Sequence, residues 1–176
     1  RRQRQMCIRD SERIAFNGTV LTPLDENKLR DAATDLIANG AEALAISFMH
    51  AYRNPNHERL AREIIQTHHP DIAVSLSSEV DPELKEYERG STTTANAYVQ
   101  PLMGRYIGSL NSTLRKNGFA GRFHLMQSSG GLTAPETAIA FPVRFLESGP
   151  AGGAQATAFV GGKIGHEDIL SFDMGG

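Results

Sequence analysis

The residues best suited to chemistry in this chain are Asp173, Gly175 and Gly176, which follow the apolar run Ile169–Phe172. We predict that this run is a buried strand leading into a phosphate-binding turn. Glycine lets backbone N–H groups approach an oxyanion closely, and an aspartate can hold Mg²⁺ through water beside phosphates. Asp-x-Gly-Gly is also ordinary turn chemistry, so the rest of the chain has to decide between the two interpretations.

Two further glycine motifs lie in the same half of the chain. Gly130 and Gly131 follow a predicted strand at 123–126, and Ser148 and Gly149 begin a predicted helix. Ligands of open α/β sheets bind beyond the carboxyl ends of the strands, and helix N-termini favour anions. These four residues are therefore candidates for a ligand cleft, with close helix packing through Gly and Ala as the alternative.

Arg89 and Ser91 are candidates for the substrate side of such a cleft. They lie in a charged and hydroxyl-rich stretch at a helix start, 86–93, where the alternatives are helix capping and a solvated face. His50 and His57 have no third ligand at a useful spacing, which favours a structural or surface role. No serine-hydrolase elbow and no Gly-x-x-x-x-Gly-Lys phosphate loop is present in the sequence.

The composition is that of an ordinary soluble protein. The 176 residues could form one domain or two small ones, and the net charge of −2 gives no attraction to nucleic acid or anionic membranes. Cys7 is the single cysteine, so an intrachain disulfide is impossible and a reducing cytoplasm is expected. Without an initiator methionine, and with its last residues in a predicted loop, the chain is expected to be a piece of a longer protein.

The first half predicts alternating strands and helices. A hairpin is expected around Asn17-Gly18, followed by a helix that begins at a Thr22 or an Asp25 cap and ends at Gly40. Strands at 43–49 and 72–76 flank a second helix capped by Asn54. Residues 19–76 thus have the order β-α-β-α-β, which favours a parallel sheet.

The second half predicts more helix than strand. Residues 82–117 are largely helical, and Pro101 should either start or kink the main helix. Shorter elements follow: a strand at 123–126, a helix at 135–140, an extended segment at 143–146, a helix at 148–160 that ends at glycines, and the strand at 169–172.

The motifs of this chain, taken together, resemble those of a known family. The similar segments are Leu21–Asp25, His50–Glu58, Glu86–Thr93 with Asn96–Tyr98, Met126–Leu132, Ser148–Gly153 and Ser171–Gly176. The family is the hydantoinase A / 5-oxoprolinase group, which includes related subunits of acetone and acetophenone carboxylases. On this resemblance, residues 1–88 are the C-terminal part of the family's N-terminal region, and 89–176 begin the hydantoinase A domain.

The resemblance implies an ATP-dependent enzyme with the actin/sugar-kinase (ribonuclease H-like) fold, in which two phosphate loops grip ATP and Mg²⁺. Asp173, Gly175 and Gly176 would belong to the second loop, with Asp173 also the best candidate for a catalytic group. Family members open a cyclic amide such as 5-oxoproline or N-methylhydantoin, or activate a ketone for carboxylation. ATP would phosphorylate an amide or enolic oxygen, and a hydantoinase B-type subunit or domain would be the partner. No nucleic acid or membrane partner is implied.

Parts of the family pattern are expected outside this chain. The first phosphate loop should lie upstream of Arg1, and the second should continue beyond Gly176, so the 176 residues alone should have no ATPase activity. Two alternatives remain open. One is a sugar-kinase relative that phosphorylates a hydroxyl, and the other is a scaffolding segment that docks a partner subunit through the helix at 94–117.

Overall fold

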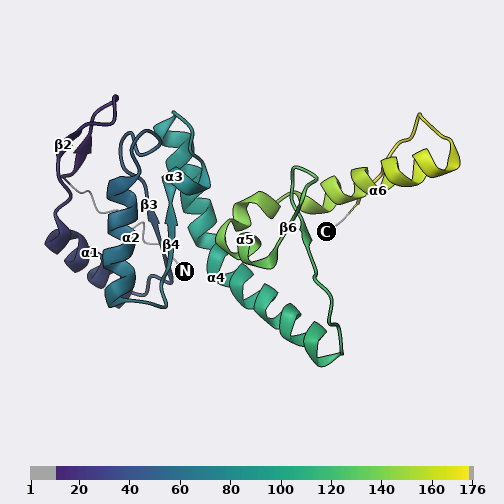
Figure 1. Cartoon of the computed structure of the whole chain (residues 1–176), viewed down its shortest axis with the longest axis horizontal. Helices are drawn as coiled ribbons and strands as arrows, with labels where there is room; N and C mark the ends of the chain where they lie inside the picture. The colour runs from purple at the N-terminus through teal and green to yellow at the C-terminus, as the bar shows by residue number, and fades with distance from the viewer. Residues whose placement is uncertain (1–10, 175–176) are drawn as a thin grey trace. The chain divides into compact units, whose positions relative to one another are not determined.

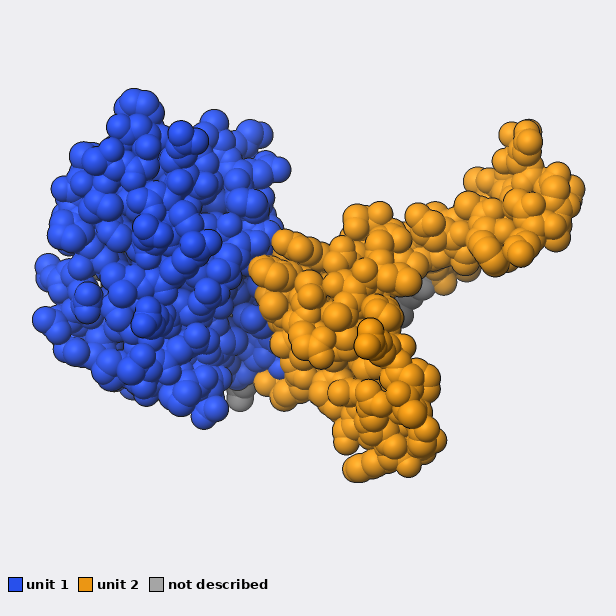
Figure 2. Space-filling model, in the orientation of Figure 1, with its two compact units in different colours: residues 1–101 blue, residues 102–176 orange. Residues whose placement is uncertain are grey.

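The computed structural model describes residues 11–174, so Cys7, Gly175 and Gly176 lie outside the described residues. Helices and short strands follow one another along the chain, as Figure 1 shows. The chain divides into two compact units, residues 1–101 and 102–176, which are coloured separately in Figure 2. The fold class is therefore α/β, as predicted.

The N-terminal hairpin is confirmed. Strand β1 (Arg13–Ile14) pairs antiparallel with β2 (Val20–Thr22). Gly18 has a φ of 90°, a left-handed backbone conformation that is strained in residues with a side chain. The Asn17 Oδ1 accepts a hydrogen bond from the Thr19 N–H at 3.1 Å. The predicted Asn-Gly turn thus closes the hairpin.

Helix α1 (Glu26–Ala38) is capped by Asp25, which decides between the two predicted caps. The Asp25 Oδ1 accepts a hydrogen bond from the Lys28 N–H at 3.1 Å. That backbone hydrogen bond is the main reason why the pKa of the Asp25 carboxyl lies below its ordinary value, and the Lys28 side chain adds to the effect. Gly40, with a φ of 93°, follows the helix as predicted.

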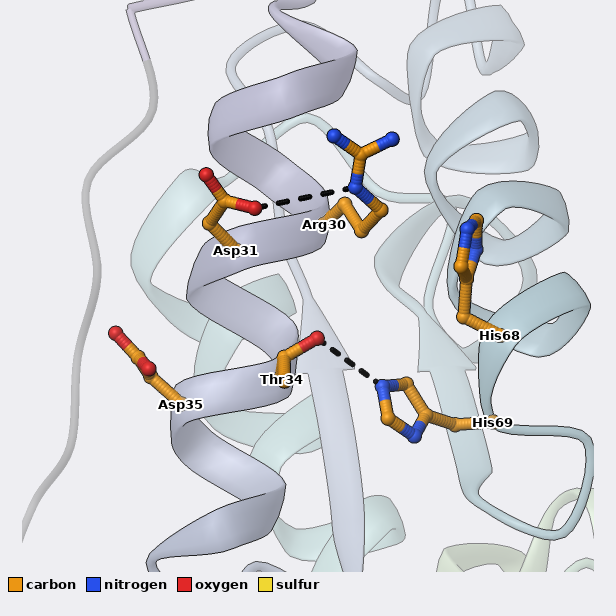
Figure 3. Close-up of a pocket in the computed structure, with 6 residues that line it drawn as sticks. All are labelled: Arg30, Asp31, Thr34, Asp35, His68 and His69. Carbon is orange, nitrogen blue, oxygen red and sulfur yellow. Dashed lines mark hydrogen bonds and ion pairs between the residues drawn. The ribbon is translucent and has the colours of Figure 1, made fainter.

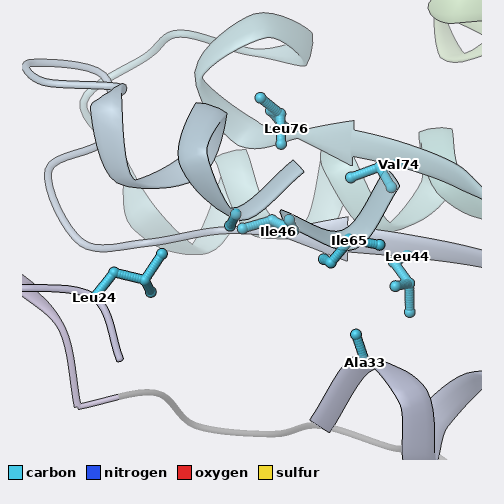
Figure 4. Close-up of a cluster of buried hydrophobic side chains, with 8 residues drawn as sticks. Leu24, Ala33, Leu44, Ile46, Ile65, Val74 and Leu76 are labelled. Carbon is cyan, nitrogen blue, oxygen red and sulfur yellow. The ribbon is translucent and has the colours of Figure 1, made fainter. Parts of the chain in front are cut away.

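The centre of the first unit is a parallel strand pair, β3 (Ala43–Ile46) and β4 (Ala73–Leu76), joined by α2 (Asn56–His68). Helices α1 and α2 pack together, and the buried side chains between them and the strands form the core seen in Figure 4. The core residues are Leu24, Ala33, Leu44, Ile46, Ala61, Ile65, Val74 and Leu76.

The predicted β-α-β-α-β order is present, but a single parallel sheet through all three strands is wrong. Strand β2 pairs with β1, so β3 and β4 form a parallel sheet of two strands in the described part of the chain. The short turn closed by Asn17-Gly18 explains this, because a tight hairpin satisfies the backbone groups of β2 locally. The predicted Asn54 cap is wrong, because α2 begins at Asn56 and its N-cap is Pro55. The Asn54 Oδ1 lies one residue earlier and accepts a hydrogen bond from the Asn56 N–H at 3.1 Å.

Two helices follow β4. The short α3 (Ser77–Val80) was not predicted, and α4 (Glu86–Lys116) runs through Pro101 without ending there. Pro101 therefore does not start the helix, and it is the last residue of the first compact unit. Gly118, with a φ of 82°, follows the helix at the predicted place.

The second unit contains strands β5 (Leu125–Met126) and β6 (Leu132–Thr133), paired antiparallel, and helix α5 (Pro135–Ala140). A 3₁₀ helix, η1 (Pro142–Phe145), and helix α6 (Ser148–Ile164) complete it. Its small core comprises Ile107, Ala138 and Phe145, with Met103, Phe123, Leu125 and Ile139 packed against them.

Three predictions for this unit need correction. The segment 143–146 is not extended, because Pro142 begins a 3₁₀ turn that buries Phe145. The strand predicted at 123–126 covers Leu125–Met126. Helix α6 continues through Gly161 and ends at Gly165, whose φ of 78° gives a left-handed cap.

The predicted buried strand at 169–172 is also wrong for this chain. The segment is an irregular coil in which Leu170 is 91% and Phe172 81% exposed. A strand needs a neighbour for its backbone hydrogen bonds, and no described strand pairs with this segment. The apolar sequence is present, but the sheet that would bury it is not among the described residues.

Candidate functional site

The glycine turn after β5 and the start of α6, which the sequence analysis proposed as parts of one cleft, are in contact. The Ser128 hydroxyl accepts a hydrogen bond from the Glu147 N–H at 3.0 Å, and the Ser128 N–H donates to the Arg144 carbonyl at 2.8 Å. Gly130 has a φ of 83°, and a Cβ on it would lie 2.7 Å from the Gln155 Nε2 on α6. The turn thus packs closely on the first turns of the helix.

Backbone hydrogen bonds fix the shape of this turn. The Gln127 N–H donates to the Gly131 carbonyl at 2.8 Å, and the Gly130 N–H donates to the Gln127 carbonyl at 2.9 Å. At the helix start, a Cβ on Gly149 would meet no atom within 4 Å, so open space adjoins that residue. Glycine turns beside a helix N-terminus have the character of an anion cradle.

Asp173 lies on the exposed coil after α6, and its carboxylate side chain is accessible. The Ser171 Oγ lies 4.0 Å from the position of a Cβ on Gly153, so this coil runs back along the same helix. An accessible carboxylate oxygen is the kind of donor that Mg²⁺ prefers. Asp173 thus supplies one donor of the chemistry that a hydrated Mg²⁺ ion takes.

Arg89, the candidate for the substrate side, is fully buried in the first unit at 0% exposure. Its Nε donates to the Ser77 Oγ at 3.0 Å, its Nη1 to the Glu83 carbonyl at 2.9 Å and its Nη2 to the Phe48 carbonyl at 2.8 Å. Nη2 also pairs with the Glu86 carboxylate. All three guanidinium nitrogens thus have protein partners.

Glu58 is a second buried charge, and the sequence analysis missed it. Its carboxylate accepts hydrogen bonds from the Phe48 N–H at 3.0 Å, the Ser77 hydroxyl at 2.6 Å and the Ser78 N–H at 2.9 Å. A signal was available, because Glu58 precedes Ala61 and Ile65 at helical spacing on the buried stripe of α2. A charge on such a stripe predicts a buried network.

The other polar candidates of this unit differ in exposure. Ser91 is exposed, whereas Thr93 and Asn96 of α4 are buried. The Thr93 hydroxyl donates to the Arg89 carbonyl at 2.6 Å, and the Asn96 Nδ2 donates to the Ser75 Oγ at 3.0 Å. His57 Nδ1 lies 2.7 Å from Glu12 Oε2 in a buried pair. Of the polar side chains of α4, Asn96 therefore contacts strand β4, and Arg89 contacts the loop after β3.

A surface pocket between α1 and α2 lies apart from these residues (Figure 3). His69 Nε2 lies 3.2 Å from the Thr34 Oγ1 there, and Asp31 contacts Arg30. None of the predicted site residues lines this pocket. Within residues 11–174, no group of three or more His, Cys, Asp or Glu side chains could hold a metal ion, and no helix is long and apolar enough to cross a membrane.

Comparison with known proteins gives two family matches that cover most of the chain. Residues 89–176 match the Hydantoinase/oxoprolinase model, and residues 2–69 match the Hydantoinase/oxoprolinase N-terminal region. The chain is 36% identical to the caprolactamase subunit alpha of Pseudomonas jessenii over 93% of this chain and 24% of the relative. It is 35% identical to the 5-oxoprolinase of Saccharomyces cerevisiae, over 89% of this chain and 12% of the relative.

Solved structures agree with these matches. The crystal structure of the ATP-dependent caprolactamase from Pseudomonas jessenii superposes with a TM-score of 0.83 at 35% identity, over 95% of this chain and 24% of that chain. Nucleotide-free acetone carboxylase, solved in a study of ATP-dependent acetone carboxylation, gives a TM-score of 0.76 at 32% identity. The match covers 89% of this chain and 22% of that chain. The chain spans about a quarter of the length of these two structures. It belongs to the hydantoinase/oxoprolinase family.

Proposed function

We propose that this chain is part of an ATP-dependent enzyme that opens a cyclic amide such as 5-oxoproline or N-methylhydantoin. Relatives named caprolactamase and 5-oxoprolinase support this substrate class. The observation that carries the proposal is the packing of the Gln127–Gly131 turn on the start of α6, with the coil that leads to Asp173 along the same helix. Two of the predicted motifs are thus in contact, and the coil that leads to the third runs along the same helix, which supports the proposal.

In this proposal Asp173, Gly175 and Gly176 bind the phosphates of ATP, and the Asp173 carboxylate holds Mg²⁺ through water. Gly130, Gly131, Ser148 and Gly149 line the cleft beside them. When bound, ATP would supply the phosphoryl group for an amide or enolic oxygen, which makes that oxygen a better leaving group and the carbon of a phosphorylated amide a better electrophile. The chain's own part is positioning, because phosphoryl transfer depends chiefly on aligned backbone N–H groups and charge.

We assign the actin/sugar-kinase fold to the complete enzyme. The small-residue helix α6, which ends at a left-handed glycine before the coil to Asp173, has the place of the helix that precedes the second phosphate loop in that fold. Ser91, which is exposed, stays a candidate for the substrate side. Arg89 is fully buried and has protein partners on all its guanidinium nitrogens, which favours a positioning role over substrate contact.

A substrate panel with the full-length protein tests the proposed reaction. ATP hydrolysis is measured with 5-oxoproline, N-methylhydantoin, caprolactam, acetone plus bicarbonate, and a set of sugars. We expect a cyclic amide to raise the hydrolysis rate about tenfold or more over the substrate-free rate. Stimulation that needs a ketone together with bicarbonate would place the enzyme in the carboxylase branch instead. Stimulation by a sugar alone would contradict the proposal in favour of a kinase.

A partner subunit is a second part of the proposal, and the exposed face of α4 supports it. Within the second unit Leu102 is 63% and Tyr106 60% exposed, one helical turn apart. Exposed aromatic and aliphatic pairs are typical of interfaces, and relatives are named as alpha, beta or gamma subunits. We propose a hydantoinase B-type subunit or domain as the partner.

Co-purification separates docking from catalysis. Tyr106→Glu in the full-length protein should abolish co-purification of the partner, whereas Asp173→Asn should leave it intact. Lys116→Glu, an exposed charge change at the end of the same helix, is the control. Retention of the partner by Tyr106→Glu would show that this face of α4 is not the docking surface.

A further inference from the structure

The loop between β3 and α2, residues 47–53, is held by charged side chains from two helices. The Phe48 N–H donates to the Glu58 Oε1 of α2 at 3.0 Å, and the Phe48 carbonyl accepts from the Arg89 Nη2 of α4 at 2.8 Å. Hydrogen bonds to ionised groups are roughly twice as strong as neutral ones. Both backbone groups of one residue are therefore fixed by buried charges.

His50 is held in the same loop in an uncommon conformation. Its φ of 57° is left-handed, its N–H donates to the Glu86 Oε1 at 3.1 Å, and its carbonyl accepts from the Arg53 N–H at 2.9 Å. The His50 Nδ1 lies 2.8 Å from the Ile14 carbonyl, which can only accept, so Nδ1 is the donor of this hydrogen bond. Left-handed backbone in a residue other than glycine persists where the surroundings enforce it.

Arg89 connects this loop to the end of β4. Its Nε donates to the Ser77 hydroxyl, which in turn donates to Glu58, and its guanidinium lies 5.5 Å from the centre of the Tyr52 ring. The planar fork of donors reaches the loop, the β4 end and Glu86 at once, which a lysine ammonium cannot do. Glu86, one helical turn before Arg89, supplies the acceptor for His50.

We propose that Glu86 and Arg89 are positioning residues that fix loop 47–53 in the conformation the enzyme uses for turnover. The loop follows the carboxyl end of a parallel strand, the edge at which α/β enzymes hold their ligands. Arg89 acts through the loop and does not itself contact substrate, because all its nitrogens bind protein atoms. The kinetic half of this proposal rests on the proposed function, and the structural half does not.

Amide hydrogen exchange in the full-length protein tests the structural half. The variants are Arg89→Met, Glu86→Ala and Glu86→Gln, with Arg62→Met as a matched control that breaks the Arg62–Glu79 pair, in which Nη1 and Oε2 lie 2.6 Å apart. We expect Arg89→Met and Glu86→Ala to speed exchange of the loop amides about tenfold or more relative to β3 and β4. Glu86→Gln keeps an acceptor for His50 and should restore most of the protection, and Arg62→Met should leave the loop unchanged.

Steady-state kinetics test the other half. Arg89→Met should lower kcat about 100-fold, the scale expected for a displaced site, while KM for ATP stays within about threefold. Unchanged loop exchange in both Arg89→Met and Glu86→Ala would overturn the proposal, as would a loosened loop with wild-type kcat. If Arg89→Met speeds exchange in β3 as much as in the loop, that variant has loosened more than the loop. The loop exchange of Glu86→Ala then decides whether the proposal holds. Should the wild type hydrolyse no ATP with any substrate, the proposed function fails, and loop exchange still decides whether these residues hold the loop.

Discussion

Single residues show how a local contact becomes a pH-dependent contribution to stability. Asp25 caps α1, and the hydrogen bond that its carboxylate accepts from the Lys28 N–H lowers the pKa of the carboxyl. Because the pKa of this carboxyl is lower in the folded state than in the unfolded state, its contribution to stability is complete at pH values above the unfolded-state pKa. The contribution is lost as the pH falls through the folded-state pKa. The loss should therefore occur in acid, below about pH 4.

Asp25→Asn tests this contribution. Asparagine caps a helix about as well as aspartate but does not titrate, so the variant should lose less stability than the wild type between neutral pH and acid. Asp25→Ala should be less stable already at neutral pH. Urea unfolding followed by circular dichroism measures both effects. If Asp25→Asn lost as much stability in acid as the wild type does, the pH dependence would come from other titratable groups.

Residue types alone predicted the turn and cap residues well but assigned the buried charges poorly. Asn17-Gly18, Asp25 and Gly118 have strong local preferences, and each lies where its preference predicts. Arg89 and Glu58 depend on partners that are distant in sequence, Phe48 and Ser77, so a local pattern could not reveal that their charges are enclosed. Whether a charged side chain is buried is a property of the tertiary structure.

Among the elements, α6 makes the clearest prediction, because two adjacent glycines differ in their surroundings. A Cβ on Gly161 would lie 1.6 Å from the Ile169 Cδ1 and 3.2 Å from the His166 carbonyl, whereas one on Gly162 would meet nothing within 4 Å. Gly162→Ala should stabilise the helix by up to about 1 kcal/mol, the difference in helix propensity. Gly161→Ala should displace the coil 166–170 from the helix.

Limited proteolysis and thermal unfolding of the two variants measure this difference. Gly161→Ala should speed cleavage within 166–170, and Gly161→Ala/Ile169→Ala should restore much of the wild-type resistance by removing the obstructing methyl group. Equal cleavage rates in Gly161→Ala and Gly162→Ala would mean that the coil does not pack on Gly161.

Helices were predicted more accurately than strands, for a physical reason. Helices α1, α2 and α4 satisfy their backbone hydrogen bonds within one segment, so periodicity and caps are nearly sufficient to predict them. Strands depend on neighbours: β2 pairs with β1 rather than β3, and the apolar segment 169–172 has no described neighbour. The η1 turn was missed because Pro142 suits extended and 3₁₀ backbone alike.

At the scale of the whole molecule, the sequence motifs predicted the family, and both family models bear this out. The predicted domain boundary between residues 88 and 89 stays a prediction. The division after Pro101 separates two compact units and does not test where the family's domains meet. The candidate cleft stays a prediction, and the structure shows that the Gln127–Gly131 turn packs on the start of α6. The roles of Asp173 and the two following glycines stay predictions, because phosphate binding depends on a ligand and on residues that the described structure does not include.

The central claim is that Asp173 lies in a phosphate- and Mg²⁺-binding loop of an ATP-dependent enzyme. Isothermal titration of the full-length protein with MgATP tests it most directly, using wild type, Asp173→Asn and the control Asp168→Asn, an exposed carboxylate on the same coil. We predict that Asp173→Asn weakens MgATP binding about tenfold or more, the scale of one lost charge-assisted contact, while Asp168→Asn stays within about twofold of wild type. Wild-type affinity in Asp173→Asn would contradict the account.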